Sequence, residues 1–185
     1  ERTRQLCQGE ELTWRQPTFS RDASKLAVLR ASGASSPVAA ARSLSVWPTA
    51  GGAAVPVTPQ SPNLISPFSN REWAPDGSHV MLFMRTPARE KEAADRFKLL
   101  TQGPIIVSSS KEPFLEWDEM QRQNRWRSLV EVDVTTGAVD ERVSERKLQT
   151  YRVARDGSFV VMQEDLTEKT DYDTIGGSEN RLQVL

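Results

Sequence analysis

The sequence is poor in the residues that cross-link proteins and carry most catalysis. Its 185 residues include one cysteine, Cys7, and one histidine, His79. A single cysteine cannot form an internal disulfide, which excludes a disulfide-stapled scaffold and a cysteine-based zinc site. It leaves the compartment open, periplasmic and secreted locations included, because many exported proteins lack disulfides as well. No stretch approaches the roughly 18 apolar residues of a membrane span, so we expect no membrane partner.

The sequence also lacks an excess of charge of either sign. It has 24 basic and 25 acidic residues, for a net charge of −1, whereas a nucleic-acid-binding protein usually shows a strong basic excess. We therefore expect no nucleic-acid partner. Basic residues cluster once, directly after an acidic group, in the order Glu116, Asp118, Glu119, Arg122, Arg125 and Arg127. This order predicts a solvated surface whose charges compensate one another.

One pattern occurs three times along the chain. Its copies are PTFSRDASKLAVLR (Pro17–Arg30), REWAPDGSHVMLFMR (Arg71–Arg85) and YRVARDGSFVVMQED (Tyr151–Asp165). Each copy reads as a short strand, a polar turn and then an apolar strand. An apolar run bounded by turn signals is typical of a buried strand. A repeat of such units indicates the fold class more strongly than any single segment does.

The turn of each copy contains an aspartate, then glycine or alanine, then serine. Asp22, Asp76 and Asp156 can accept hydrogen bonds from the backbone two residues on, and glycine supplies the positive φ of a tight hairpin. Ala23 replaces glycine in the first copy. We expect that turn either to be of a different type or to be mildly strained.

A second landmark, consisting of a strand, a glycine turn and another strand, follows the first two copies. It is centred on Gly51–Gly52 in one unit and on Thr135–Gly137 in the other. Each full unit therefore holds four antiparallel strands, which is the content of a β-propeller blade. The third copy reaches only its third strand, Arg181–Leu185. We predict an all-β fragment of one propeller domain with about two and a half blades.

The predicted blades differ in length. Within the single domain 1–185, blade 1 spans about 16–60, blade 2 about 68–144 and the incomplete blade 3 about 147–185. The extra length of blade 2 is an insertion of about 86–127 between two of its strands.

The insertion begins with a stretch of helix-forming composition, Pro87–Leu100. Proline suits the first turn of a helix, and Ala93, Phe97 and Leu100 fall on one face at helical spacing. We therefore expect a partly helical insertion that leaves the blade and covers a neighbouring surface.

Within the second copy, WAPDGSHVMLF (Trp73–Phe83) resembles the Asp-Gly propeller repeat that TolB-like proteins share with the propeller domains of prolyl oligopeptidase family serine peptidases. Two further stretches, Lys111–Met120 and Gln163–Asp173, resemble the peptidase branch more closely. The resemblance implies a non-catalytic propeller that caps a C-terminal α/β-hydrolase domain, which carries the catalytic triad, and that restricts entry to small peptide substrates. The alternative is a TolB-like propeller that serves as a protein-binding or scaffold module.

The same resemblance singles out an acidic group in the insertion. Dipeptidyl-peptidase-type propellers use a pair of glutamates on an inserted segment to hold the free amine of the substrate by charge-assisted hydrogen bonds. Glu116, Asp118 and Glu119 lie in the inserted segment beside Trp117, although their order departs from that motif. They are the candidate substrate-binding residues, and the competing interpretation is a charge cluster at a helix end.

No catalytic machinery is complete in this sequence, because a serine triad needs a nucleophile, a base and an orienting acid. Ser178 lies in GGSEN, which lacks the last glycine of the G-x-S-x-G elbow and lies between strands. His79 follows an aspartate turn at the start of a strand, where we expect a structural role. We predict no catalytic residue and no hydrolysis of peptides or esters by the chain alone.

Carboxylates are the metal ligands that the sequence offers in number. Asp171 and Asp173, together with Asp165 or Glu168, are candidates for a hard-cation site, but they lack the glycine-spaced pattern of a calcium loop. We expect an acidic surface loop there, with no metal and no cofactor.

Two further expectations concern apolar side chains. Trp73 should fill the space between two blades, as aromatic residues of propellers mostly do. Because a strand edge without a partner exposes unpaired backbone groups, we expect the isolated chain to self-associate. The expected contacts are the open edge of the third unit or the insertion, through Leu182, Val184, Leu185, Phe97, Leu99 and Leu100.

Overall fold

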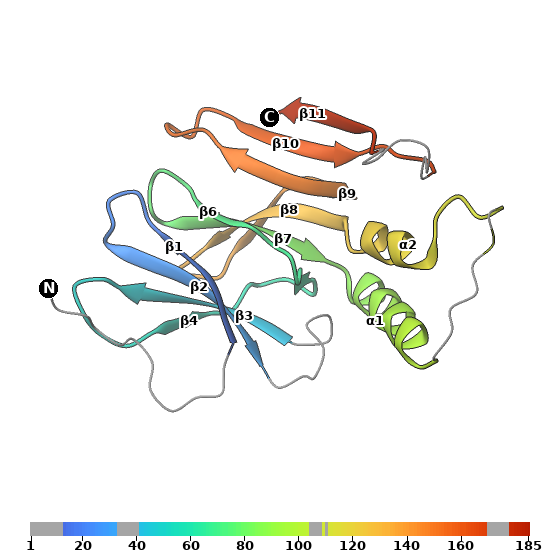
Figure 1. Cartoon of the computed structure of the whole chain (residues 1–185). Coiled ribbons are helices and arrows are strands. Elements are labelled where there is room, and N and C mark those ends of the chain that lie inside the picture. Colours follow the sequence, from blue (N-terminus) through green and yellow to red (C-terminus); the bar gives the residue numbers. More distant parts are fainter. Residues whose placement is uncertain (1–12, 33–40, 104–108, 110, 170–177) are drawn as a thin grey trace, which may run out of the picture.

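A computed structural model of the chain describes residues 13–32, 41–103, 109, 111–169 and 178–185 (Figure 1). Most of these residues lie in antiparallel strands. The elements are β1 (Thr13–Phe19), β2 (Lys25–Ser32), β3 (Ala41–Pro48), β4 (Val55–Val57), β5 (Leu64–Ile65), β6 (Arg71–Trp73), β7 (His79–Arg85), α1 (Pro87–Thr101), α2 (Glu116–Gln123), β8 (Trp126–Asp133), β9 (Val139–Val153), β10 (Val160–Asp165) and β11 (Asn180–Val184).

The strands form two sheets. The first has the order β1-β2-β3-β4, and the second has the order β11-β10-β9-β8-β7-β5, with β6 also paired to β7. The second sheet joins two sets of strands through β9, whose residues 139–147 pair with β8 and whose residues 148–153 pair with β10. One long strand therefore ends one four-stranded unit and begins the next (Figure 1).

Strand β7 is apolar from Val80 to Met84 instead of alternating, and the packing of its two faces explains why. Val80 and Leu82 pack in a core shared with the first sheet, whereas Met81 and Phe83 pack in a second core toward β9 and β10. Both faces of the strand are thus covered, and a strand buried on both faces reads as a continuous apolar run. These sheets confirm the predicted all-β, partial propeller-like fold.

The three aspartate turns form hairpins, as predicted, and each contains the same kind of hydrogen bond. In each turn the aspartate Oδ1 accepts the backbone N–H two residues on, at 3.0 Å for Asp22, 2.9 Å for Asp76 and 3.1 Å for Asp156. Hydrogen bonds from Ser20 and Ser24 lower the pKa of Asp22 to about 2. The carboxylates are therefore ionised in the folded chain at neutral pH, where they fix the turns.

Ala23 has the same left-handed conformation as the glycines of the other two turns. Its φ is 57°, against 66° for Gly77 and 77° for Gly157. The turn type is therefore retained, and the strained alternative is the correct one, because a β-carbon is disfavoured at positive φ. Gly157 is further constrained, since a β-carbon there would lie 2.7 Å from the Pro75 ring.

The first and second units meet through Trp73. Its indole is buried, and its Nε1 donates a hydrogen bond of 2.8 Å to the carbonyl of Thr18 in β1. Trp73 thus packs between the two sheets, in the core that they share. At the turns, a guanidinium N–H of Arg21 donates to the carbonyl of Arg155, which brings the first and third turns together at one end of the sheets.

The inserted segment between β7 and β8 holds both helices, which confirms a partly helical insertion in the second unit. Helix α1 begins with Pro87, and the hydroxyl of Thr86 accepts the N–H of Arg89 at 3.3 Å as its N-cap. Ala93 and Leu100 are buried, as their helical spacing predicts. Neither described helix is long and apolar enough to cross a membrane.

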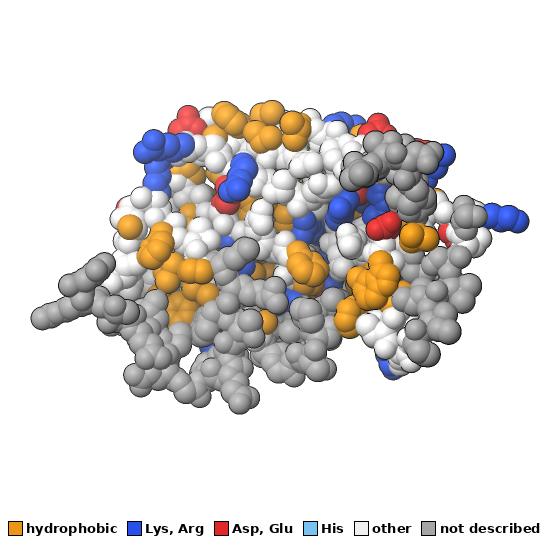
Figure 2. Space-filling model, viewed as in Figure 1, with side chains coloured by type: hydrophobic (Ala, Val, Ile, Leu, Met, Phe, Trp, Pro, Cys, Tyr) orange, Lys and Arg blue, Asp and Glu red, His pale blue; other side chains and the backbone are white. Residues whose placement is uncertain are grey.

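Some, but not all, of the apolar residues expected at self-association contacts are exposed to solvent. Leu182 and Val184 on the terminal strand β11 are 71% and 68% exposed, and among the described residues no strand pairs with its outer edge. Figure 2 shows apolar side chains gathered at this end of the molecule. In the insertion Leu99 is exposed, but Leu100 is buried. Leu100 is therefore wrong as a contact residue, because it packs inward from α1.

The Ala23→Gly variant should be more stable than the parent chain. The left-handed conformation destabilises a folded alanine by about 1–2 kcal/mol. Glycine avoids this cost, but its greater freedom in the unfolded chain lowers the free energy of unfolding by about 0.4–1 kcal/mol. We expect a net gain of about 0.5–1 kcal/mol in urea denaturation. The matched control is Gly77→Ala, which adds a β-carbon in the same conformation with no atom within 4 Å and should destabilise. A loss of stability in Ala23→Gly would contradict the assignment of strain.

Candidate functional site

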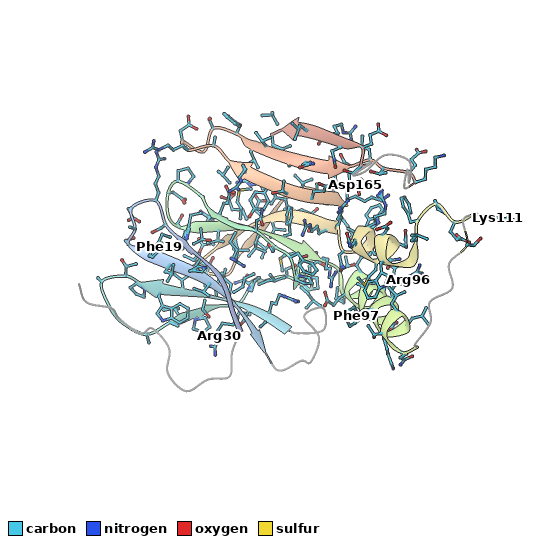
Figure 3. All side chains as sticks on the ribbon, viewed as in Figure 1. Phe19, Arg30, Arg96, Phe97, Lys111 and Asp165 are labelled. Carbon is cyan, nitrogen blue, oxygen red and sulfur yellow. The ribbon has the colours of Figure 1, made fainter. Side chains whose placement is uncertain are left out.

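The inserted helices cover the end of the sheets opposite to the aspartate turns. Strand β7 ends where the insertion begins and β8 starts where it ends, while the turns lie at the far ends of these strands (Figure 1). Strand β10 runs from its own turn toward the insertion and ends at Asp165. The carboxylate of Asp165 is thereby brought beside α2 (Figure 3).

Asp165 joins the insertion to the third unit. Its Oδ2 accepts hydrogen bonds from Nη1 of Arg122 at 2.9 Å and from Nη1 of Arg125 at 2.5 Å. Its Oδ1 accepts the backbone N–H of Thr167 at 3.0 Å and the hydroxyl of Thr167 at 2.6 Å. The side chain of Asp165 is 0% exposed. We call Asp165, Arg122, Arg125 and Thr167 the carboxylate hub.

The hub keeps Asp165 ionised. Burial raises the pKa of this carboxyl, but the hydrogen bonds from Thr167 and Arg125 and the charge of Arg122 outweigh burial and hold the pKa below its ordinary value. For Arg122, burial lowers the pKa, while Asp165 favours the cation. Each buried charge therefore depends on the other, and removing one would leave the rest uncompensated.

Arg122 also orders the segment that precedes α2. Its Nη2 donates a hydrogen bond of 2.8 Å to the carbonyl of Thr167, and its guanidinium lies 3.8 Å from the ring centroid of Phe114. A guanidinium over an aromatic face is attracted by the ring quadrupole. One arginine thus fixes both the aromatic ring and the chain beyond β10.

The prediction of a solvated, self-compensating surface is wrong for this arginine cluster. Arg122 and Arg127 are buried, and Arg125 is partly buried. Arg122 and Arg125 pair instead with Asp165, which lies 43 residues after Arg122, and Glu119 and Asp118 act on Arg122 as further nearby charges. Arg127 donates to the carbonyls of Leu148, Gln149 and Phe68.

The expected acidic surface loop also needs correction at one position. Asp165 is buried in the hub and is not part of a surface. Glu168 is exposed, and Asp171 and Asp173 lie outside the described residues. Within the described part of the chain, no group of three His, Cys, Asp or Glu residues is arranged to hold a metal ion.

A hollow of about 720 Å³ lies beside the hub, and we call it the charged hollow. Its lining includes two carboxylates, three cationic side chains and two aromatic rings. The acids are Glu112 and Glu119, the cations are Arg96, Arg122 and Lys147, and the rings are Phe114 and Trp126. Such a lining offers partners for an ammonium, for a carboxylate and for apolar groups, all of which a peptide carries.

Trp126 forms one wall of the charged hollow and is held by two cations. The guanidinium of Arg89 lies 4.8 Å and the ammonium of Lys147 5.8 Å from the centroid of a Trp126 ring. Arg89 is in turn bonded to Glu145, whose carboxylate accepts from Nε at 3.2 Å. The wall is therefore anchored on both α1 and β9.

Of the predicted substrate-binding residues whose side chains are described, helix α2 brings Glu119 to the charged hollow and leaves Asp118 outside it. Glu119 lines the charged hollow and accepts a hydrogen bond from Gln123 at 3.3 Å. Asp118, its sequence neighbour, is half-buried and is not part of that lining. Glu116 is the first residue of α2, and its side chain lies outside the described residues. Glu112, which the sequence did not single out, lines the hollow with Glu119.

Ser178 and His79 lie at opposite ends of the sheets. Ser178 is exposed next to Glu179, whose N–H donates to the hydroxyl of Thr167 at 2.8 Å, so it belongs to the hub end. His79 lies at the turn end, where its Nδ1 is 2.9 Å from a carboxylate oxygen of Asp76. Ser178 and His79 therefore do not come together as a nucleophile and its base.

No protein-family model matches the sequence, and no curated protein matches it either. Solved structures do match its fold. An acylaminoacyl peptidase from Pyrococcus horikoshii aligns with a TM-score of 0.50 at 7% identity, over 87% of this chain and 18% of that one. A prolyl endopeptidase, studied for the role of inter-domain dynamics in catalysis and specificity, aligns with a TM-score of 0.55 at 14% identity, over 94% of this chain and 20% of that one.

A third structure, an acylaminoacyl peptidase in complex with Z-Gly-Gly-Phe-chloromethyl ketone, aligns with a TM-score of 0.54 at 8% identity, over 94% of this chain and 23% of that one. The chain thus spans about a fifth of the length of the structures it matches. At these identities the likeness establishes a shared fold.

Replacing Asp165 by asparagine should strongly destabilise the chain. It leaves two cations without their carboxylate, and breaking a buried ion pair costs about 3–5 kcal/mol. The matched control is Asp140→Asn, because Asp140 is exposed and pairs with an exposed Arg142, and such pairs contribute about 1 kcal/mol or less. Urea denaturation at pH 7 measures both, and equal losses for the two variants would contradict the role of the hub.

The effect of this substitution should also depend on pH. The folded-state pKa of Asp165 is below its ordinary value, so its stabilisation is fully present above the unfolded pKa of about 4 and is lost as pH falls through the lower folded pKa. The difference between the parent chain and Asp165→Asn should therefore shrink below about pH 4. A difference that stays constant down to pH 2.5 would rule out this linkage.

Proposed function

We propose that this chain is the propeller portion of a prolyl oligopeptidase-like serine peptidase, and that its insertion-bearing face positions peptide substrates for an α/β-hydrolase domain. The observation that carries the proposal is the fold shared with acylaminoacyl and prolyl peptidases, of which this chain spans about a fifth. The Asp-Gly repeat and the two peptidase-like stretches support it from the sequence. The α/β-hydrolase domain is the proposed partner, and it would supply the triad.

In this proposal the chain contributes blades to one propeller. Blade 1 corresponds to about 16–60, blade 2 to about 68–144 and the incomplete blade 3 to about 147–185. The sharing of β9 between two sets of strands supports this division, because one set of strands then follows directly on the other.

The charged hollow is the proposed place where the substrate terminus is held. Glu119 lines it, and Glu116 lies one helical turn earlier on α2, so both positions share a helix face. Carboxylates on such a face bind an ammonium by charge-assisted hydrogen bonds. Asp118 is the third proposed acid, with the supporting role of adding negative charge to the same helix.

The second candidate function is a TolB-like binding or scaffold module, which the exposed edge of β11 favours. Leu182 and Val184 are exposed on this strand, and an unpaired edge is a template for pairing with another chain. Self-association of the isolated chain through this edge belongs to the same proposal. A module of this kind would bind proteins and hydrolyse nothing.

The two proposed functions can be distinguished by assaying peptide hydrolysis by the protein that the longest reading frame containing this chain encodes. We expect it to cleave short peptides, and we expect the chain alone to cleave none. In that longer protein Glu119→Gln should raise KM about tenfold for peptides with a free amine, since a charge-assisted hydrogen bond is worth about 1.5–3 kcal/mol, and should leave acetylated peptides unaffected.

The control variant for this experiment is Glu168→Gln, because Glu168 is exposed and lies outside the charged hollow. It should leave KM unchanged for both kinds of peptide. A longer reading frame without a G-x-S-x-G elbow and without peptidase activity would overturn the peptidase proposal and favour the scaffold module.

A further inference from the structure

A second hollow, of about 530 Å³, lies on another side of α2, and we call it the apolar hollow. Phe97 reaches it from α1, Met120 from α2 and Phe68 from the segment before β6. Phe68 is 49% exposed although it is a large aromatic residue. Figure 2 shows apolar side chains at the surface beside the inserted helices. The hollow thus offers aromatic and thioether walls that the described residues leave open.

The charge of the apolar hollow has one sign. Among the described residues, its lining contains two arginines, Arg125 and Arg127, and no carboxylate. Arg125 shares the carboxylate of Asp165 with Arg122, so Asp165 does not pair with Arg125 alone. The side chain of Arg125 is 29% exposed, which leaves part of the guanidinium accessible.

Arg127 is the second cation of the apolar hollow, and among the described residues no carboxylate pairs with it. Its three nitrogens donate to the carbonyls of Leu148, Phe68 and Gln149, and it lies 3.9 Å from the ring centroid of Phe83. Burial lowers the pKa of Arg127 to about 9. A desolvated cation of this kind is stabilised by any anion that enters the hollow.

The walls are also fixed in advance. The bond from Arg127 to the carbonyl of Phe68 ties the segment before β6 to β8, and the N–H of Phe83 donates to the hydroxyl of Ser69 at 2.6 Å. Met120 is buried on α2, which the hub holds. A site whose walls are ordered before binding loses little freedom when a ligand enters.

We infer that the apolar hollow binds the carboxyl-terminal residue of a peptide, with an apolar side chain between Phe68 and Phe97 and the terminal carboxylate on Arg125. The planar guanidinium matches a carboxylate with two parallel hydrogen bonds. The apolar walls and the two arginines together favour a ligand that carries an apolar side chain directly beside one negative charge. This inference rests on the proposed function, because it names the peptide class that the insertion-bearing face would handle.

Binding of acetyl-Gly-Gly-Leu, as the free acid and as the amide, to the isotope-labelled chain tests the inference. We expect the free acid to shift the Nε–Hε signal of Arg125 and the methyl signal of Met120, and to bind about tenfold more tightly than the amide. Arg125→Gln should abolish this preference. The control Arg142→Gln removes an exposed arginine that pairs with Glu131 and should retain it.

A second variant keeps the test decisive if Arg125→Gln perturbs the hub. Phe97→Ala leaves the arginines in place and should weaken binding of the free acid about tenfold, whereas Leu99→Ala on the exposed side of α1 should not. Equal affinity for acid and amide, or acid preference retained in Arg125→Gln, would overturn the inference.

A second copy of the chain in the hollow is the remaining outcome. It would shift the Met120 signal with protein concentration and without peptide, and it would also overturn the inference. Each of these results is independent of hydrolysis by the longer reading frame, so failure of the carboxylate site and failure of the peptidase proposal are distinguishable.

Discussion

One buried carboxylate, that of Asp165, ties the inserted helix α2 to the third unit of the sheets. The insertion leaves β7 and returns to β8 as an excursion of 40 residues (86–125), and Arg85 at the end of β7 contacts Glu90 and Asn124 within it. Arg122 and Arg125 carry two positive charges to the end of β10, and the buried oxygens of Asp165 are where those charges are compensated. Because α2 lines both the charged hollow and the apolar hollow, this contact stabilises one wall of each.

The fold was readable from the sequence because its determinants are local. The aspartate turns recur at matched positions, and strands covered on both faces read as apolar runs, so the units could be aligned without coordinates. The conformation of Ala23 could not be read in the same way. An alanine permits either a changed turn or a strained one, and the packing of the surrounding strands decides for strain.

The site was less readable, because its contacts join residues far apart in sequence. Glu119 was identified from its neighbours, and helical spacing would have paired it with Glu116 sooner than with Asp118. Nothing local connects Arg122 with Asp165, and a run of acids followed by bases reads as a surface in which each charge meets its neighbour. The burial of the arginines follows from the fold, which brings β10 to α2.

The most direct test of the hub is amide hydrogen exchange of α2 in Asp165→Ala. If Asp165 holds the insertion, its removal should lower the free energy that protects α2 by about 3 kcal/mol, so amide exchange in α2 should accelerate about a hundredfold. The ratio of the exchange rates in β7 and β8 should stay as it is in the parent chain. Protection of α2 that equals the parent chain would contradict the account, because the helices would then be placed by packing alone.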